Sequence, residues 1–198
     1  MREFLVAFSR ARSAPDVPLD DLPSSGGRFD LVCRVVAAAF LVSNGIRRDV
    51  RLTLVLEGPP KPPLAVRLRG DALRNLHPDE RSIAAWLLRA MAKPSVPGAW
   101  LSAGDGIELS RALPSDVLAE RPDAPLVVLA EDGVPLEKAE LPAGAWFVLG
   151  DDRGVPPSLA SALSTRRALR LSVGPVSLHT DQCVAILHNA LDRAGATR

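Results

Sequence analysis

The pattern of apolar and polar positions divides the N-terminal half of the chain into strands and helices. Alternation of apolar and polar residues is typical of a half-buried strand, whereas apolar residues recurring every three or four positions indicate a helix. On this basis we predict strands at residues 3–8, 50–56 and 64–68, and helices at residues 29–42 and 79–91. The second and third strands flank a proline-rich segment and are expected to pair as a hairpin. Residues 9–27, polar and rich in proline and glycine, are expected to form a surface loop, and residues 96–108 stay unassigned.

The C-terminal half contains three similar units, each an apolar strand followed by a turn that contains glycine. The strands lie near Leu126, Ala145 and Ala168, and their near-continuous apolar runs are typical of a parallel sheet covered on both faces. We also predict helices at residues 114–119, at residues 158–164 and from about Leu178 onward. Alternation of strands with helices or long loops indicates an α/β layer fold. Because backbone groups around such turns and helix starts are left unpaired, the three turns could together wall a pocket for a small polar ligand.

Composition and charge exclude some classes of protein without selecting a function. The chain has 198 residues, 47% of them hydrophobic, which suits one domain with an ample core. Lys and Arg number 24 against 23 Asp and Glu, so the total charge does not favour nucleic acid, although a local arginine patch can still bind phosphate. Cys33 and Cys183 lie far apart and form no disulfide framework or metal signature. With no signal-peptide core and no apolar run near ~20 residues, we expect a soluble, cytoplasmic protein.

Few residues could carry chemistry by themselves. Four acids follow two of the predicted strands: Glu131, Asp132, Asp151 and Asp152. Carboxylates suit Mg²⁺, but we interpret these acids as solvated turn residues and expect no metal. Three histidines lack zinc spacing and are expected at the surface or at helix ends: His77, His179 and His188. Apolar neighbours raise the pKa of a thiol, so Cys183 is interpreted as a pocket wall, and the usual nucleophile and phosphate-binding motifs are absent.

Charged residues on two predicted helices are candidates for contact with RNA. Asp30 and Arg34 stand at positions i and i+4 of the first helix, and Arg81 opens the second. The plainer interpretation of the first two is an intrahelical ion pair, worth about 0.3–0.5 kcal/mol if it is exposed. The rigid fork of arginine also suits phosphates and planar bases. Spacing alone leaves both interpretations open.

Several ordered segments together resemble the tRNA pseudouridine N1-methyltransferases (TrmY-like proteins) of the SPOUT superfamily. The segments are MREFLVAF, PLDDLPSSGGRFDLVCRVVAAAFLVSNGIRRDV, LRNLHPDERSIAAWLL, VVLAEDG, FVLGDDRG and SVGPVSLHTDQCVAILHNALD. The resemblance covers nearly the whole length and implies one SPOUT domain over residues 1–198. Its fold would be a parallel sheet flanked by helices, with a C-terminal deep trefoil knot within about residues 125–194. The family is homodimeric, and it uses S-adenosylmethionine to methylate N1 of pseudouridine 54 in tRNA.

The resemblance also implies site residues, carried over position by position. The cofactor contacts would fall on Leu129, Gly150, Val173, Gly174, Pro175, Val176, Ser177, Leu178 and Cys183. S-adenosylmethionine has no phosphate, so apolar walls and backbone groups at strand ends are sufficient to hold it. On the acceptor side, Asp30 is a candidate to accept the N1 proton or to orient the base. Arg34 and Arg81 are candidates to hold a phosphate or the carbonyl groups of the nucleotide.

Some positions depart from the pattern expected of the family. Asn44 stands where relatives often carry histidine, and the segments GDDRG and TDQC also differ from the usual versions. These differences concern polar residues near the acceptor side and leave the glycine framework intact. Two alternatives therefore stay open: the same chemistry on ribosomal RNA, and a non-catalytic knotted RNA-binding or assembly factor. Binding of S-adenosylmethionine would distinguish a methyltransferase, whether it acts on tRNA or on ribosomal RNA, from a non-catalytic factor, which would not bind it.

Overall fold

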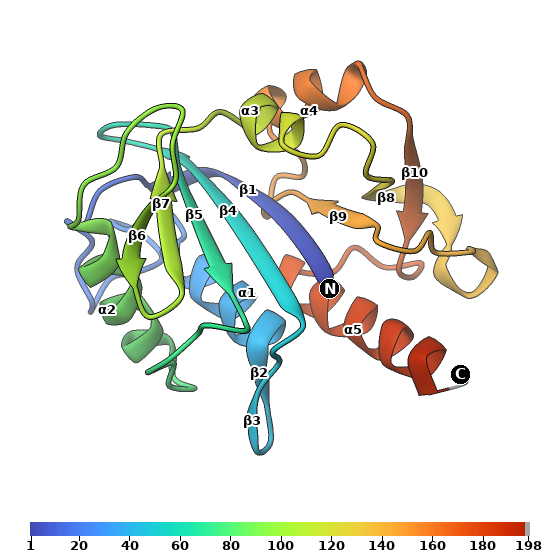
Figure 1. The fold of residues 1–198 in the computed structure, drawn as a ribbon, viewed down its shortest axis with the longest axis horizontal. Coiled ribbons are helices and arrows are strands. Elements are labelled where there is room, and N and C mark those ends of the chain that lie inside the picture. The colour runs from blue at the N-terminus through green and yellow to red at the C-terminus, as the bar shows by residue number, and fades with distance from the viewer. Residues whose placement is uncertain (197–198) are drawn as a thin grey trace.

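The computed structural model describes residues 1–196 and is built around one eight-stranded sheet (Figure 1). The strands are β1 (Arg2–Arg12), β4 (Val50–Gly58), β5 (Leu64–Arg69), β6 (Leu101–Gly104), β7 (Ile107–Ser110), β8 (Leu126–Pro135), β9 (Trp146–Leu149) and β10 (Ala168–Ser172). Their order across the sheet is β10-β8-β9-β1-β4-β5-β7-β6. The last two residues of the predicted 1–198 domain lie outside the described residues.

The sheet is parallel in one half and antiparallel in the other. Strand β1 pairs in parallel with both β4 and β9, and β8 pairs in parallel with β9 and β10. The remaining neighbours, β4 with β5, β5 with β7 and β7 with β6, are antiparallel. The predicted parallel C-terminal strands and the predicted β4–β5 hairpin are therefore confirmed, as is the mixed α/β class.

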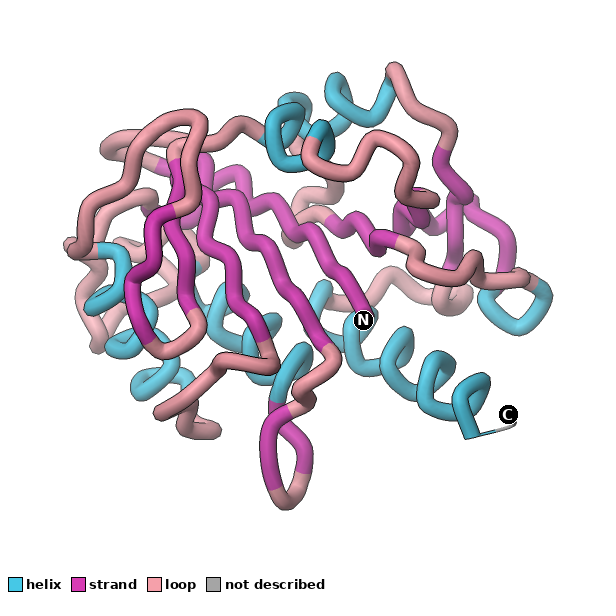
Figure 2. The backbone as a smooth tube through the Cα atoms, viewed as in Figure 1, coloured by secondary structure: helices cyan, strands magenta, loops and turns pink. Residues whose placement is uncertain are grey.

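Helices cover both faces of the sheet, as Figures 1 and 2 show. They are α1 (Phe29–Phe40), α2 (Glu80–Met91), α3 (Pro114–Ala119), α4 (Pro157–Ser164), α5 (Thr180–Ala196) and the short 3₁₀ helix η1 (Leu136–Lys138). A two-stranded hairpin, β2 (Leu41–Val42) with β3 (Gly45–Ile46), projects below the sheet in the view of Figure 1. No helix within residues 1–196 is long and apolar enough to cross a membrane.

Strand β1 shows how one apolar run builds two cores. Phe4, Val6 and Phe8 belong to the core that holds α1, α2 and α5, while Leu5 and Ala7 belong to the core under α3 and α4. All five side chains are essentially fully buried. Because successive side chains of a strand point to opposite faces, a continuously apolar strand must be covered on both sides. The hydrophobic pattern of β1 thus requires the layered architecture.

Several predicted boundaries in the N-terminal half were wrong. Strand β1 continues to Arg12, into the segment predicted as a loop, because its end still pairs with Gly58 of β4. The first helix stops at Phe40, since Leu41 adopts extended backbone and enters the β2–β3 hairpin. The unassigned residues 96–108 contribute the hairpin of β6 and β7. In each case pairing with another segment overrides the local pattern.

Boundaries near the predicted pocket also differ in detail. Strand β8 does not end at Ala130, but its pairing with β10 is interrupted: Arg170 lies opposite Val128, and the next residue, Leu171, lies opposite Val134. Residues 129–133 are thus left out of the pairing with β10, at the position of the predicted turn. The final helix begins at Thr180, slightly later than predicted. The result is a set of loops at the carboxyl ends of three parallel strands.

Candidate functional site

A cavity of about 730 Å³ opens where the carboxyl ends of β8, β9 and β10 meet the start of α5. In open α/β sheets this edge is where ligands commonly bind, and the volume lies in the range of ligand pockets. The predicted cofactor contacts that line the cavity are Leu129, Gly150, Val173, Gly174, Val176, Ser177, Leu178 and Cys183. Pro175 is the predicted contact that does not line it. The structure therefore confirms that the three strand-end segments share one cavity, while contact with a cofactor stays a prediction.

The loop after β9, residues 150–154, is a tight turn that forms one wall. Asp151 and Gly154 exchange backbone hydrogen bonds of 3.1 Å in both directions. A Cβ added to Gly150 would lie inside the van der Waals radius of the Gly154 carbonyl, so only glycine fits at position 150. The Thr180 hydroxyl donates to the Gly150 carbonyl at 2.7 Å. That bond joins the start of α5 to the loop and keeps two walls of the cavity together.

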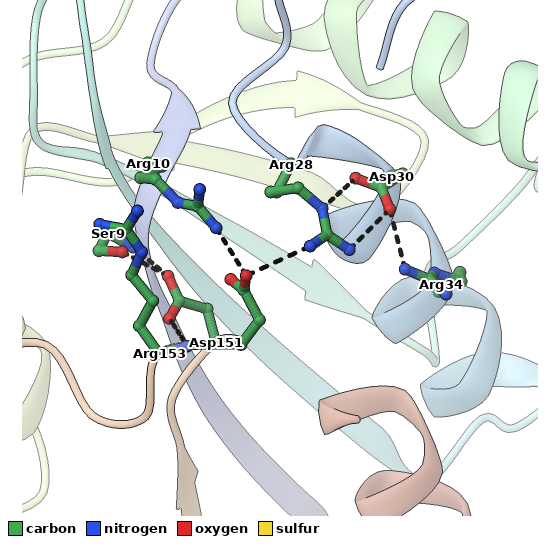
Figure 3. Close-up of polar contacts among 8 residues, drawn as sticks. Ser9, Arg10, Arg28, Asp30, Arg34, Asp151 and Arg153 are labelled. Carbon is green, nitrogen blue, oxygen red and sulfur yellow. Dashed lines mark hydrogen bonds and ion pairs between the residues drawn. The ribbon is translucent and has the colours of Figure 1, made fainter. Parts of the chain in front are cut away.

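The two acids of this loop lie in a turn, as predicted, and Asp152 is exposed, but both also accept hydrogen bonds from distant segments, which the interpretation as solvated turn residues did not include. One carboxylate oxygen of Asp151 accepts from the backbone N–H (2.7 Å) and the hydroxyl (2.6 Å) of Ser9, at the end of β1 (Figure 3). Asp152 accepts from the guanidinium groups of Arg10 at 2.6 Å and Arg28 at 3.2 Å. The cavity loop is thus attached both to β1 and to the residue that precedes α1. These contacts join segments far apart in sequence.

Asp30 lies in a network of arginines beside the cavity rather than in its wall. Arg28 donates two hydrogen bonds to its carboxylate, at 3.0 and 3.1 Å, and Arg34 donates a third at 2.8 Å (Figure 3). The predicted ion pair of Asp30 with Arg34 is therefore confirmed, and Arg34 also lies 3.8 Å from Glu80. Sequence reasoning did not select Arg28, although its spacing to Asp30 in the run GGRFD could have drawn attention to it.

The electrostatics of Asp30 bear on its predicted role. Burial favours the protonated form, but hydrogen bonds and charge from Arg28, with the charge of Arg34, outweigh it and lower the pKa of Asp30 below its usual value. The hydrogen bond with Asp30 in turn raises the pKa of Arg28. A carboxylate that is ionised and already accepts from two arginines is a weak proton acceptor. The geometry therefore favours orientation of a base over removal of its proton.

The other candidates occupy separate places. Arg81 is exposed in the first turn of α2, next to Glu80, and none of the contacts of the described residues links it to the cavity. Burial, followed by the charge of Asp181, raises the pKa of the Cys183 thiol, which supports its interpretation as a wall residue. His77 and His179 are exposed, as predicted. The prediction for His188 was wrong, because this side chain is only 2% exposed between α5, α1 and β1.

Residues 1–196 match the family described as "Putative SAM-dependent RNA methyltransferase". The chain belongs to this family. It is 45% identical over 194 residues to a Methanopyrus kandleri protein named tRNA (pseudouridine(54)-N(1))-methyltransferase, covering 97% of this chain and 93% of the relative. A Halobacterium salinarum protein with the same name is 41% identical, with 98% of each chain covered. The chain is thus an S-adenosylmethionine-dependent RNA methyltransferase by family.

A solved structure shares the fold despite low sequence identity. The crystal structure of Archaeoglobus fulgidus Nep1 bound to S-adenosylhomocysteine superposes with a TM-score of 0.68 over 98% of this chain and 99% of that one. Sequence identity is 11%, so this likeness shows the fold alone. The arrangement of the chain's sheet and helices is therefore the same as in that solved structure.

The residues of the cavity fit the methyl donor of this family. The apolar side chains of Leu129, Leu178 and Cys183 can pack on a planar ring, and the loop backbones offer carbonyl and amide groups. Acids on the wall, among them Glu131, complement a sulfonium and an ammonium group, and Arg153 and Arg170 on the same wall complement a carboxylate. Within residues 1–196 no three His, Cys, Asp or Glu side chains are grouped so as to hold a metal ion. The lining therefore fits S-adenosylmethionine, which carries both positively charged groups and a carboxylate.

Proposed function

We propose that this protein methylates N1 of pseudouridine 54 in tRNA with S-adenosylmethionine as the methyl donor. The observation that carries the proposal is the full-length similarity to several relatives that bear this activity in their names, at 45% and 41% identity for two of them. The cavity supports it, because its wall residues fit the donor and its position matches the ligand edge of an α/β sheet.

In this mechanism the protein acts mainly by alignment. S-adenosylmethionine, when bound, supplies a methyl group already activated by the sulfonium. Leu129, Leu178 and Cys183 line the cavity and would exclude water and pack around the adenine ring, while the backbone of the Gly150 loop would bind its polar edge. Asp30, held by Arg28 and Arg34, orients the acceptor base so that N1 faces the methyl group. The N1 proton leaves to water or to an acceptor outside this ion-paired network.

Three further features belong to the same proposal. We expect the deep trefoil knot within about residues 125–194, a homodimer, and action in the cytoplasm. The first expectation rests on the resemblance to the SPOUT superfamily. The second is supported by α5, whose outer side carries the half-buried apolar residues Ile186 and Ala190. Arg81 stays a predicted contact to the RNA backbone, since its side chain is exposed next to Glu80 in the first turn of α2.

The test uses purified protein, S-adenosylmethionine and two matched tRNA transcripts, one carrying pseudouridine and one carrying uridine at position 54. Mass spectrometry of digested RNA should detect 1-methylpseudouridine in the first transcript alone. Methylation of ribosomal RNA but not of tRNA would contradict the proposal and favour the ribosomal alternative. A protein that does not bind S-adenosylmethionine in calorimetry would favour an assembly factor.

The role of Asp30 has its own test. Asp30→Ala should lower turnover on tRNA while the calorimetric affinity for S-adenosylmethionine stays close to that of the wild type, because Asp30 does not line the cavity. Asp71→Ala is a matched control, since Asp71 is exposed and pairs with Arg69 in another part of the sheet. Unchanged methylation by Asp30→Ala would remove Asp30 from the acceptor side.

A further inference from the structure

The adjacent acids Asp151 and Asp152 make different kinds of contact. Asp151 stabilises the loop through backbone groups: its carboxylate accepts from the Arg153 backbone N–H at 2.8 Å and from the Ser9 backbone N–H in β1. Asp152 accepts from side chains only, those of Arg10 and Arg28, at 2.6 and 3.2 Å. Its removal would therefore leave the hydrogen bonds that shape the loop intact. Two neighbouring carboxylates can thus be separated by experiment.

Arg28 stands between Asp152 and Asp30 and contacts both with one planar group. Its Nε and Nη2 atoms donate to Asp30 (Figure 3), and its Nη1 atom donates to Asp152. Because the guanidinium is rigid and planar, a partner on Nη1 sets the orientation of the edge that faces Asp30. The Arg28 backbone is itself fixed: it adopts φ 70°, ψ 36° and its N–H donates to the Pro23 carbonyl at 3.0 Å. The position of the Arg28 guanidinium then depends on its two partners, the carboxylates of Asp152 and Asp30.

This arrangement connects the cavity wall with the carboxylate of Asp30. Asp152 lines the cavity, whereas Asp30 does not. The charges are partly shielded from water, with side-chain exposures of 21% for Asp152, 28% for Arg28 and 11% for Asp30. Ion pairs with such limited exposure are screened less than pairs on an open surface. A neutral group at position 152 would leave Arg10 and Arg28 facing each other without the anion between them.

We propose that Asp152 is a positioning residue. It holds the Arg28 guanidinium in place, and Arg28 in turn fixes the orientation of the Asp30 carboxylate relative to the methyl-donor cavity. The inference rests on the proposed function, in which Asp30 orients the acceptor base. It assigns Asp152 a role through Arg28 and Asp30, without direct contact to the reacting atoms. Loss of Asp152 should therefore affect alignment of the acceptor more than affinity for the donor.

The experiment compares wild type with Asp152→Asn, Arg28→Lys and the double variant, and with Asp71→Asn as a control. Asp71→Asn likewise neutralises an exposed aspartate paired with an arginine, Arg69 at 3.0 Å, whereas Asp152→Asn affects two arginines beside the cavity. Turnover on pseudouridine-54 tRNA is measured together with the calorimetric Kd for S-adenosylmethionine. In parallel, NMR follows the Arg28 Nε–H signal, assigned by its absence in Arg28→Lys.

Asp152→Asn should lower kcat about tenfold, a size consistent with a small misalignment of reacting groups, while the Kd for the donor changes less than about threefold. The Arg28 Nε–H signal should shift or broaden. The double variant should lose no more than the worse single variant, because both residues act on the same group. Asp71→Asn should match wild type in all three readouts.

Four outcomes would overturn the inference. Three concern the kinetics: wild-type kcat in Asp152→Asn, losses that multiply in the double variant, or a fall in kcat matched by an equal loss of donor affinity. An unmoved Arg28 signal would overturn it as well. The proposed function fails separately, if the wild-type protein binds S-adenosylmethionine and leaves pseudouridine 54 unmethylated. In that event the NMR comparison still decides whether Asp152 holds Arg28.

Discussion

His188 provides a quantitative prediction about stability and pH. Its Nε2 atom lies 3.1 Å from the Ala39 carbonyl, which can only accept, so Nε2 must carry the proton. Its Nδ1 atom, 3.1 Å from an Arg2 nitrogen, must then accept from the guanidinium. A proton on Nδ1 would place a second donor against Arg2. Burial, and then the charges of Arg47 and Arg2, lower the pKa of His188 from 6.5 to about 4, against opposing contributions from the hydrogen bond with Ala39 and from the charge of Asp192.

The sign and size of the effect follow from linkage. Between pH 6.5 and about 4 the unfolded chain binds a proton at His188 that the folded protein does not. Stability is therefore fully present above pH 6.5 and is lost as the pH falls toward 4. A difference of this size corresponds to about 3 kcal/mol over the whole window, of which roughly 2 kcal/mol is already lost at pH 5.

The measurement is urea unfolding at pH 7.5 and pH 5.0 for wild type and His188→Gln. Glutamine can donate to Ala39 and accept from Arg2 without titrating, so its loss of stability between the two pH values should be smaller by about 2 kcal/mol. His77→Gln, at an exposed histidine, is the matched control, and its stability should change between the two pH values as that of the wild type does. Equal pH dependence of wild type and His188→Gln would refute the reasoning. The pKa of Asp192 is lowered to about 2, chiefly by its hydrogen bond with Arg47, so its titration changes stability at pH values below the range of this measurement.

Three other predictions concern the cavity. Gly150→Ala should weaken binding of S-adenosylmethionine at least tenfold in calorimetry, because a Cβ would collide with the Gly154 carbonyl; wild-type affinity would contradict the described loop. Thr180→Val removes the donor to the Gly150 carbonyl and should lower the unfolding free energy by about 1 kcal/mol in urea, whereas no change would show that water replaces the hydroxyl. Cys183→Ala should retain turnover within about threefold, since a wall thiol with a raised pKa is no nucleophile; loss of all turnover with donor affinity preserved would contradict this.

Much of the fold could be predicted from local pattern. The short helix at Pro114–Ala119 has the predicted bounds, and the parallel strands β8, β9 and β10 lie where near-continuous apolar runs predicted them. Periodicity works here because burial on one or both faces is decided by the strand's own residues. The prediction that three turns share a cavity also succeeded, since the ends of adjacent parallel strands must meet at one edge.

Other features could not be read from the sequence, because they depend on which distant segments meet. The β6–β7 hairpin has a weak local pattern and exists because β7 pairs with β5. Nothing local distinguishes His188 from a surface residue of an amphipathic helix; packing against Phe4 and Ala39 makes it buried.

The sequence by itself determined the class of the fold, the run of strands and helices, and the segments that supply the cavity walls, since these follow from periodicity and from motifs a few residues long. Only the tertiary structure decided how charges are paired. Asp152 and Arg28 are 124 positions apart, and their contact exists because the ends of β1 and β9 and the start of α1 converge. Coulombic attraction depends on distance in space, and distance along the chain does not predict it.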